Sequence, residues 1–289
     1  MHKLLKSITI PLFCLFTGGA FLPSAVAIDI DKTQLSIVRI VTIRSEDGKG
    51  TVKTGIGTGF IINENGNIIT NQHVVDGAEE INGVSQIFAL RTVKGETRLY
   101  RCKCEAQHSK EPDLAVLSSS IKAPYLVLNT VEPKPTSAIY RVGFPAVSDT
   151  NDSHIHSAFI TAILSKRDDP AVAGAGADIT RAMSEDKRLH DMVIPSWFTG
   201  QVRRMSISQA FLTGTGLRVV DCDIAGTHGT SGGPLLDEGG HVIGVVGEGF
   251  SMAPGGMDAG HTNLAQAELA KFLVGHGIKF EAKAWETGR

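Results

Sequence analysis

The sequence predicts an all-β protein made of two six-stranded antiparallel β-barrels, with a C-terminal helix and a partly helical insertion in the second barrel. Short β-branched runs alternate with turns along most of the chain, and they fall into two sets that separate near residue 135. The 289 residues include 32 glycines, while aromatic residues make up only 6%. This composition favours many tight turns over a helical bundle.

The first set of strands lies in residues 28–135, the predicted N-terminal barrel. Six or seven short strands in about 100 residues indicate a closed barrel or a sandwich. Asn65-Gly66 is a strong hairpin signal between two of them. The predicted strands are residues 37–43, 57–62, 68–70, 86–92, 97–105, 114–118 and 125–128.

The second set lies in residues 136–289 and predicts a larger C-terminal barrel. Near the end, Asn263 can cap a helix of about residues 263–275, whose apolar stripe includes Leu269, Phe272 and Leu273. The predicted strands are residues 138–143, 155–164, 203–212, 217–221, 234–236 and 242–246.

The insertion, about residues 166–202, interrupts this second set. Asp178 can cap a helical stretch within it, and residues 195–198 form an apolar patch. A loop of this length in a compact domain is usually functional or disordered. Two interpretations stay open: a lid or substrate-selecting wall, and a surface helix without a functional role.

Residues 1–27 are typical of a secretory signal peptide. Lys3 and Lys6 precede an apolar stretch over residues 8–22, and Ala25-Val26-Ala27 gives small residues for cleavage before Ile28. The alternative is a membrane anchor, but the apolar run is shorter than the roughly 20 residues that a spanning helix needs. We therefore expect an exported protein, periplasmic or secreted, with no stable membrane insertion after cleavage.

Charge and cysteine content limit the partners. The net charge is −2, and removal of the leader's two lysines makes the chain slightly more acidic, so neither nucleic acid nor an anionic membrane is an expected partner.

The cysteines Cys102, Cys104 and Cys222 remain after the leader. They are either buried thiols, which we favour, or one of the first two bridges to Cys222. No metal site or cofactor is predicted, and the sequence does not indicate an oligomeric state.

Three residues in the order His73, Asp113, Ser231 suggest nucleophilic catalysis. Acyl transfer by a serine needs a base to take its proton and an acid to orient that base. It also needs backbone N–H groups for the oxyanion, which Gly229 and Ser231 can supply from a glycine-rich turn. Each residue alone has an ordinary interpretation as a turn or surface residue, but the three together favour catalysis.

The blocks around these residues resemble the chymotrypsin-fold (trypsin-like) serine peptidases, and in detail the protease domain of the HtrA/Deg type. The histidine block is residues 57–75, including Thr70-Asn71-Gln72-His73-Val74-Val75, and the acid block is Asp113-Leu114-Ala115-Val116-Leu117. The serine block is residues 223–236, with Gly229-Thr230-Ser231-Gly232-Gly233-Pro234 at its centre. The resemblance covers roughly residues 34–167 and 203–275. It implies that Ser231 is the nucleophile, His73 the base and Asp113 the acid.

Two departures from the family pattern affect regulation. Thr230 precedes the serine where zymogen-type relatives carry Asp and HtrA-type relatives carry Asn. Without a charge there, the Ile28 terminus is not expected to switch on activity. Only about a dozen residues follow the C-terminal helix, which is too few for a PDZ domain. We therefore carry over neither PDZ-controlled assembly nor trimerisation.

The resemblance also implies a substrate-binding pocket. It places Ala225 at the pocket base beside Gly226, His228 on the rim, and Gly247-Glu248-Gly249 as a wall whose backbone pairs with substrate. A neutral base favours a small or medium apolar substrate side chain. The expected function is an endopeptidase that acts on polypeptides. The alternatives are a protease-fold binding or scaffolding protein, and an esterase, although α/β-hydrolases need the order Ser, Asp, His.

Overall fold

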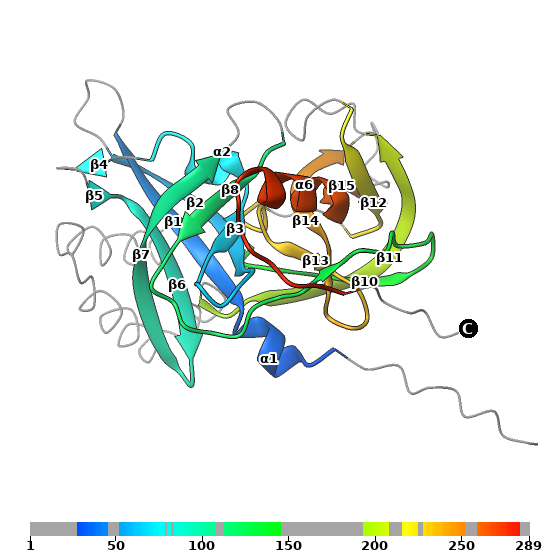
Figure 1. The fold of residues 1–289 in the computed structure, drawn as a ribbon, viewed down its shortest axis with the longest axis horizontal. Helices are drawn as coiled ribbons and strands as arrows, with labels where there is room; N and C mark the ends of the chain where they lie inside the picture. The colour runs from blue at the N-terminus through cyan, green and yellow to red at the C-terminus, as the bar shows by residue number, and fades with distance from the viewer. Residues whose placement is uncertain are drawn as a thin grey trace, which may run out of the picture.

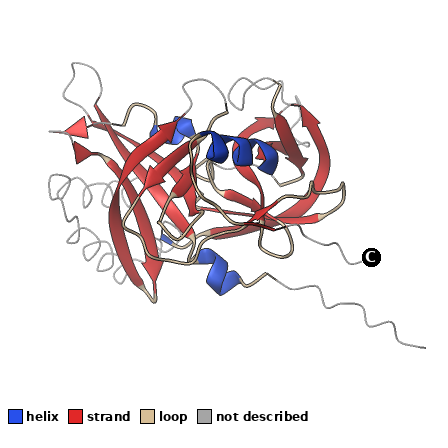
Figure 2. Cartoon of the chain, viewed as in Figure 1, coloured by secondary structure: helices blue, strands red, loops and turns tan. Residues whose placement is uncertain are grey.

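The computed structural model describes residues 28–45, 52–78, 80–81, 84–107, 112–145, 193–207, 216–224, 228–251 and 259–283. Within these residues the chain is mostly strand, with two barrels side by side and three helices around them (Figures 1 and 2). The predicted signal peptide, the predicted strand 155–164 and the insertion up to residue 192 lie outside the described residues.

The first barrel is closed and has six antiparallel strands, as predicted. Strand alternation explains its core, because Val38 and Ile40 of β1 and Ile68 of β3 face one interior cluster with Ala89 and Leu117. A separate two-stranded sheet of β4 (Glu80–Ile81) and β5 (Val84–Ser85) accompanies it. In barrel order the strands are β1 (Ile37–Ser45), β2 (Val52–Ile61), β3 (Ile68–Thr70), β8 (Ala115–Ser118), β7 (Glu96–Gln107) and β6 (Ile87–Val93).

The second barrel also has six antiparallel strands, and pairing of β13 with β14 closes it. Ile139, Val220, Leu235 and Ile243 form its interior together with Cys222. The fold class predicted from the sequence is thus confirmed. In barrel order the strands are β10 (Ala138–Gly143), β11 (Ser196–Ile207), β12 (Arg218–Cys222), β15 (Ala259–Ala265), β14 (Val242–Ser251) and β13 (Pro234–Leu236).

The C-terminal segment returns to the connection between the barrels. There β16 (Ala282–Lys283) pairs in parallel with β9 (Leu128–Asn129), and β9 pairs in parallel with β14. The N–H of Leu128 donates to the carbonyl of Glu281 at 2.9 Å, and Asn63 Nδ2 donates to the carbonyl of Lys279 at 2.7 Å. The tail therefore contacts both the first barrel and the linker.

Three helices complete the described structure: α1 (Ile30–Gln34), α2 (Gln72–Val75) and α6 (Gln266–Gly275). The side chain of Asp29 caps α1 by accepting from the N–H of Lys32 at 3.0 Å. Helix α6 lies beside the second barrel (Figure 1). It buries the predicted apolar residues Leu269, Phe272 and Leu273 in the core shared by the two barrels.

Several predicted boundaries are wrong. Asn263 does not cap the C-terminal helix, because it belongs to β15 and its Nδ2 donates to the carbonyl of Val220 at 3.1 Å. Helix α6 begins at Gln266, after Ala265. The segment 125–128 forms a strand only at residues 128–129, and β15 was not predicted. Local patterning misses β15 because its pairing with β12 and β14 brings together distant parts of the chain.

The end of the predicted insertion is also different. Strand β11 begins at Ser196, and residues 196–201 pair with the whole of β10. Trp197 and Phe198, interpreted from the sequence as an insertion patch, are therefore residues of a barrel strand. Trp197 packs edge-on against Tyr140 at a centroid distance of 6.3 Å, while the ring of Phe198 lies 4.7 Å from the guanidinium carbon of Arg141.

Candidate active site

His73 lies on the four-residue helix α2, directly after β3 of the first barrel. Asn71 is extended (φ −80°, ψ 151°) and connects the strand to the helix. Val74 and Val75 are buried in the barrel core, whereas the His73 side chain is 39% exposed. Burial of the two valines thus turns the imidazole outward, to a position where a ligand can reach it.

Asp113 contacts His73 through both carboxylate oxygens. Oδ1 accepts the backbone N–H of His73 at 2.9 Å, and Oδ2 lies 2.6 Å from the ring Nδ1. Asp113 is only 8% exposed, because Leu114 and Ala115 continue from it into the barrel core. A carboxylate at Nδ1 favours the tautomer with its proton on Nδ1, which leaves Nε2 as a hydrogen-bond acceptor. The imidazole is therefore oriented to act as a base at Nε2.

The loop that carries Ser231 packs tightly against this histidine turn. Gly229 and Gly232 have φ values of +85° and +82°, which favour glycine. A Cβ at Gly232 would lie 2.7 Å from the backbone nitrogen of Asn71 and in contact with Thr58 and Thr70. The absence of a side chain at Gly232 thus allows the half-buried Ser231 to lie near the first barrel.

Thr58 of β2 joins the first barrel to the serine loop. Its N–H donates to the carbonyl of Ser231 at 2.9 Å, and its hydroxyl donates to the carbonyl of Gly229 at 2.8 Å. The same hydroxyl accepts the N–H of Phe144 at 2.9 Å. Because Thr58 is fully buried, these bonds are shielded from water. Thr58 therefore connects β2, the serine loop and the segment that follows β10.

The backbone around Ser231 has two N–H groups suited to an oxyanion. Among the described residues, neither Gly229 nor Ser231 donates its N–H to another group of the chain, whereas Gly232 and Gly233 donate to Val246 and Thr230. Ser231 and His73 share no hydrogen bond within the part of the chain that the structure describes. Such bonds are often long before substrate binds.

The residues predicted to line a substrate pocket are only partly described. Ala225 and Gly226 lie outside the described residues, and His228 is exposed. Gly247 is buried in β14, the strand that also carries Glu248 and Gly249. The role of these residues in specificity stays a prediction.

Sequence reasoning gave no role to Thr58 and Asn71. The Nδ2 of Asn71 donates to the backbone carbonyl of Asp113 at 2.8 Å, so Asn71 links the acid to the histidine turn. A polar residue between two glycines of a strand, as in Gly57-Thr58-Gly59, is the signal that could have identified Thr58. Asn71 had no local signal, because its partner lies 42 residues away.

The three described cysteines are free thiols, so the alternative of a bridge to Cys222 is wrong. Cys102 and Cys222 are buried in the first and second barrels, and Cys104 is partly buried. Burial raises the pKa of Cys102 to about 12. These thiols therefore have the structural environment that the sequence favoured.

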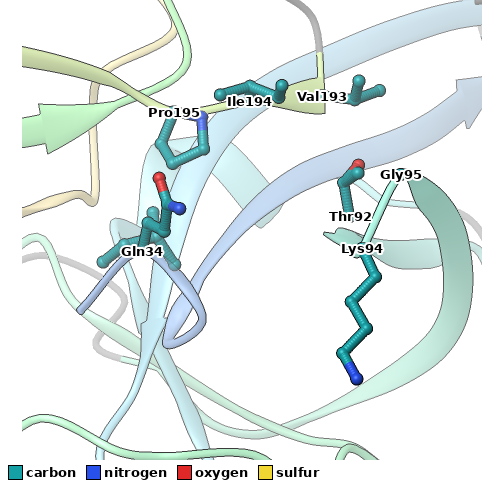
Figure 3. Close-up of a pocket in the computed structure, with 8 residues that line it drawn as sticks. Gln34, Thr92, Lys94, Gly95, Val193, Ile194 and Pro195 are labelled. Atoms are coloured by element: carbon teal, nitrogen blue, oxygen red, sulfur yellow. The ribbon is translucent and has the colours of Figure 1, made fainter. Parts of the chain in front are cut away.

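A cavity of about 160 Å³ lies apart from the candidate catalytic residues. It is lined by Gln34 and Ile37, by the turn between β6 and β7, and by residues 193–195. Figure 3 shows Gln34 and Lys94 on opposite sides of this cavity. None of the predicted site residues lines it.

A family model for the trypsin-like peptidase domain matches residues 57–245, about two thirds of the chain. The chain belongs to the trypsin-like peptidase domain family. This confirms the resemblance to chymotrypsin-fold serine peptidases. The peptidase domain is 28% identical over 191 residues to HhoA of Synechocystis sp., a protein named as a serine protease. That match covers 66% of this chain but only 36% of HhoA, so the chain spans about a third of its relative's length.

Solved structures show the same fold. The peptidase domain is similar to the active form of the Rv3671c protease from M. tuberculosis, with a TM-score of 0.56 and 18% identity, covering 89% of this chain and 86% of that one. An inactive form of Rv3671c gives a TM-score of 0.52 and 19% identity, covering 85% and 90%. Within the described residues, no helix is both long and apolar enough to span a membrane.

Proposed function

We propose that this trypsin-like peptidase is an exported serine endopeptidase, with Ser231 as nucleophile, His73 as general base and Asp113 as the orienting acid. The observation that carries the proposal is the double contact of Asp113 with the ring and the backbone of His73. Packing of Gly232 against Asn71 supports it, because this packing brings the serine loop to the same turn.

In the proposed reaction, Ser231 Oγ attacks the carbonyl carbon of the scissile peptide bond while His73 Nε2 takes its proton. Asp113 stabilises the imidazolium that forms. The N–H groups of Gly229 and Ser231 bind the oxyanion of the tetrahedral intermediate. His73 then protonates the leaving amine, which yields an acyl-enzyme. Water, deprotonated by His73, attacks this ester and releases Ser231.

The proposed substrates are extended polypeptides with a small or medium apolar side chain before the cleaved bond. The neutral Ala225 and the glycines of Gly247-Glu248-Gly249 support this preference. The backbone of β14 would pair with the substrate as an added strand. Lys3, Lys6 and the small residues 25–27 support export to the periplasm or the medium.

Replacement of the nucleophile tests the proposed function. We expect Ser231→Ala to abolish both fluorophosphonate labelling and casein cleavage without changing the unfolding transition. Ser118→Ala is the matched control, because Ser118 lies on β8 and bonds to Glu105 at the surface. Labelling and cleavage by this control should equal those of the wild type.

Two results would contradict the proposal. If the folded wild-type protein neither labels nor cleaves casein or a peptide library, the scaffolding alternative is favoured. If Ser231→Ala retains wild-type labelling, another nucleophile carries the reaction.

A further inference from the structure

One face of the β1–β2 ribbon is hollowed where it meets helix α2. Gly55 and Gly57 lie two residues apart on β2 and therefore belong to the same face of the ribbon, and Gly55 pairs with Thr42 of β1. A Cβ at Gly57 would lie 2.5 Å from Cγ1 of Val74, and a Cβ at Gly55 would lie 3.0 Å from Nη2 of Arg44. The two glycines thus leave space for Val74 and for the guanidinium of Arg44.

Arg44, near the end of β1, uses this space to reach the C-terminal end of α2. Its Nη2 donates to the backbone carbonyl of His73 at 3.0 Å and to that of Val74 at 2.9 Å. These carbonyls belong to the last turn of the helix, where a cation is favoured by the helix dipole and by carbonyls without helical partners. The hydroxyl of Thr42 adds a weaker bond to the carbonyl of Val74 at 3.4 Å.

The backbone of His73 is therefore held on both sides. Asp113 accepts its N–H at 2.9 Å, and Arg44 donates to its C=O at 3.0 Å. A helix of four residues does not form on its own, because ordering the first turn costs more free energy than the hydrogen bonds of that turn contribute. The place of α2 on the barrel is thus set by these tertiary contacts.

We propose that Arg44 is a positioning residue for the general base: its guanidinium holds the last turn of α2 so that His73 Nε2 stays within reach of Ser231 Oγ. This inference rests on the proposed function. Arg44 bonds to the backbone carbonyls of His73 and Val74, so it acts on the general base through the backbone of α2 and not through the reacting atoms. A displacement of about 1 Å in a catalytic group can lower the rate about 100-fold.

Three variants test this role. Arg44→Met keeps much of the side-chain volume but removes both hydrogen bonds. Arg44→Lys keeps a cation that can bond to one carbonyl at a time. Arg98→Met is the matched control, because Arg98 is an exposed arginine on β7 that pairs with the exposed Glu96 of the same strand. Kinetics on a peptide substrate, the rate of fluorophosphonate labelling and the melting temperature are measured for each.

We expect Arg44→Met to lower kcat about 10- to 100-fold with little change in KM, and to slow labelling by the same factor. Arg44→Lys should recover part of kcat, and Arg98→Met should behave as the wild type. In proton NMR, the downfield signal of the His73 Nδ1–H should shift or broaden in Arg44→Met. If Arg44 only stabilised the fold, Arg44→Met would lower the fraction of protein molecules that react with the fluorophosphonate, and kcat per labelled site would stay at the wild-type value.

Two results would overturn the inference. In the first, folded Arg44→Met has the wild-type kcat per labelled site. In the second, Arg44→Lys has a kcat as low as that of Arg44→Met while both variants keep the wild-type NMR signal of His73. If Arg44→Met does not fold, the comparison of Arg44→Lys with the wild type decides: unchanged kcat and an unchanged NMR signal overturn the inference. An inactive wild type with inactive Ser231→Ala contradicts the proposed function instead, so the two failures are distinguishable.

Discussion

At the scale of single residues, Gly232 connects the two halves of the candidate site. It lies directly after the proposed nucleophile, and its Cα faces the backbone of Asn71 two residues before His73. Its φ of +82° and this close approach both require the absence of a side chain. The position of Ser231 relative to His73 thus depends on the absence of a side chain at Gly232.

We predict that Gly232→Ala lowers kcat/KM at least 100-fold and the free energy of unfolding by about 2 kcal/mol or more, because the methyl group pushes the serine loop away from Asn71. Peptide kinetics and urea unfolding measure the two effects. Gly95→Ala is the matched control: its φ is +81°, but a Cβ there would meet nothing within 4 Å. Equal effects of the two substitutions would show that backbone strain alone explains the loss.

At the scale of elements, the hairpin between β13 and β14 is held by one partly buried carboxylate, that of Asp237. Asp237 Oδ1 accepts the N–H groups of Gly239 and His241 at 2.9 Å each, and Oδ2 accepts Asn129 Nδ2 at 2.7 Å. Burial acts to raise the pKa of Asp237, but the hydrogen bonds from His241 and Asn129 outweigh it and hold the pKa below its ordinary value. The carboxylate form therefore stabilises the folded chain.

This lowered pKa predicts a loss of stability in acid. The unfolded chain takes up the proton first, so the contribution of Asp237 is complete above the ordinary aspartate pKa of about 4 and disappears as the pH falls through the folded pKa. We expect Asp237→Asn to be less stable than the wild type by about 1–2 kcal/mol at pH 6 in urea unfolding, and the difference to shrink at pH 3. Glu238→Gln, at an exposed position of the same hairpin, should show no such pH dependence. A constant difference at both pH values would contradict the assignment.

At the scale of the whole molecule, one core joins the barrels, the linker and the C-terminal tail. Phe60 and Ile69 of the first barrel and Phe144 of the second share this core with Leu128 of the linker. Ile278 and Phe280 of the tail pack against it, and Tyr125 donates its hydroxyl proton to Glu281. The tail therefore contributes to the contact between the barrels.

We expect the double variant Ile278→Ala/Phe280→Ala to lose about 2–3 kcal/mol of unfolding free energy, because two half-buried side chains leave the shared core. Urea unfolding followed by fluorescence measures the loss. Val274→Ala on α6 serves as the control, since Val274 is 70% exposed and should change nothing measurable. Wild-type stability of the double variant would show that the tail only lies on the surface.

Local patterning was sufficient for the fold class because strand alternation and turn residues act over a few positions. The runs at residues 37–43 and 138–143 became β1 and β10 with little change. The order of His73, Asp113 and Ser231, each inside a distinctive block, was likewise enough to indicate serine peptidase chemistry. In contrast, the boundaries of β11 and α6 were missed. Strand β11 begins at Ser196 because it pairs there with β10, and α6 begins only after β15, whose residues up to Leu264 pair with β12.

The sequence by itself thus determined two antiparallel barrels, the peptidase family and the three candidate catalytic residues. Only the tertiary structure decided how these residues are held. Thr58 bonds to a loop 171 positions away, and Arg44 reaches a carbonyl 29 positions away. The physical reason is that periodicity reports which face of a strand is buried, whereas such hydrogen bonds exist only once the barrels close and pack together.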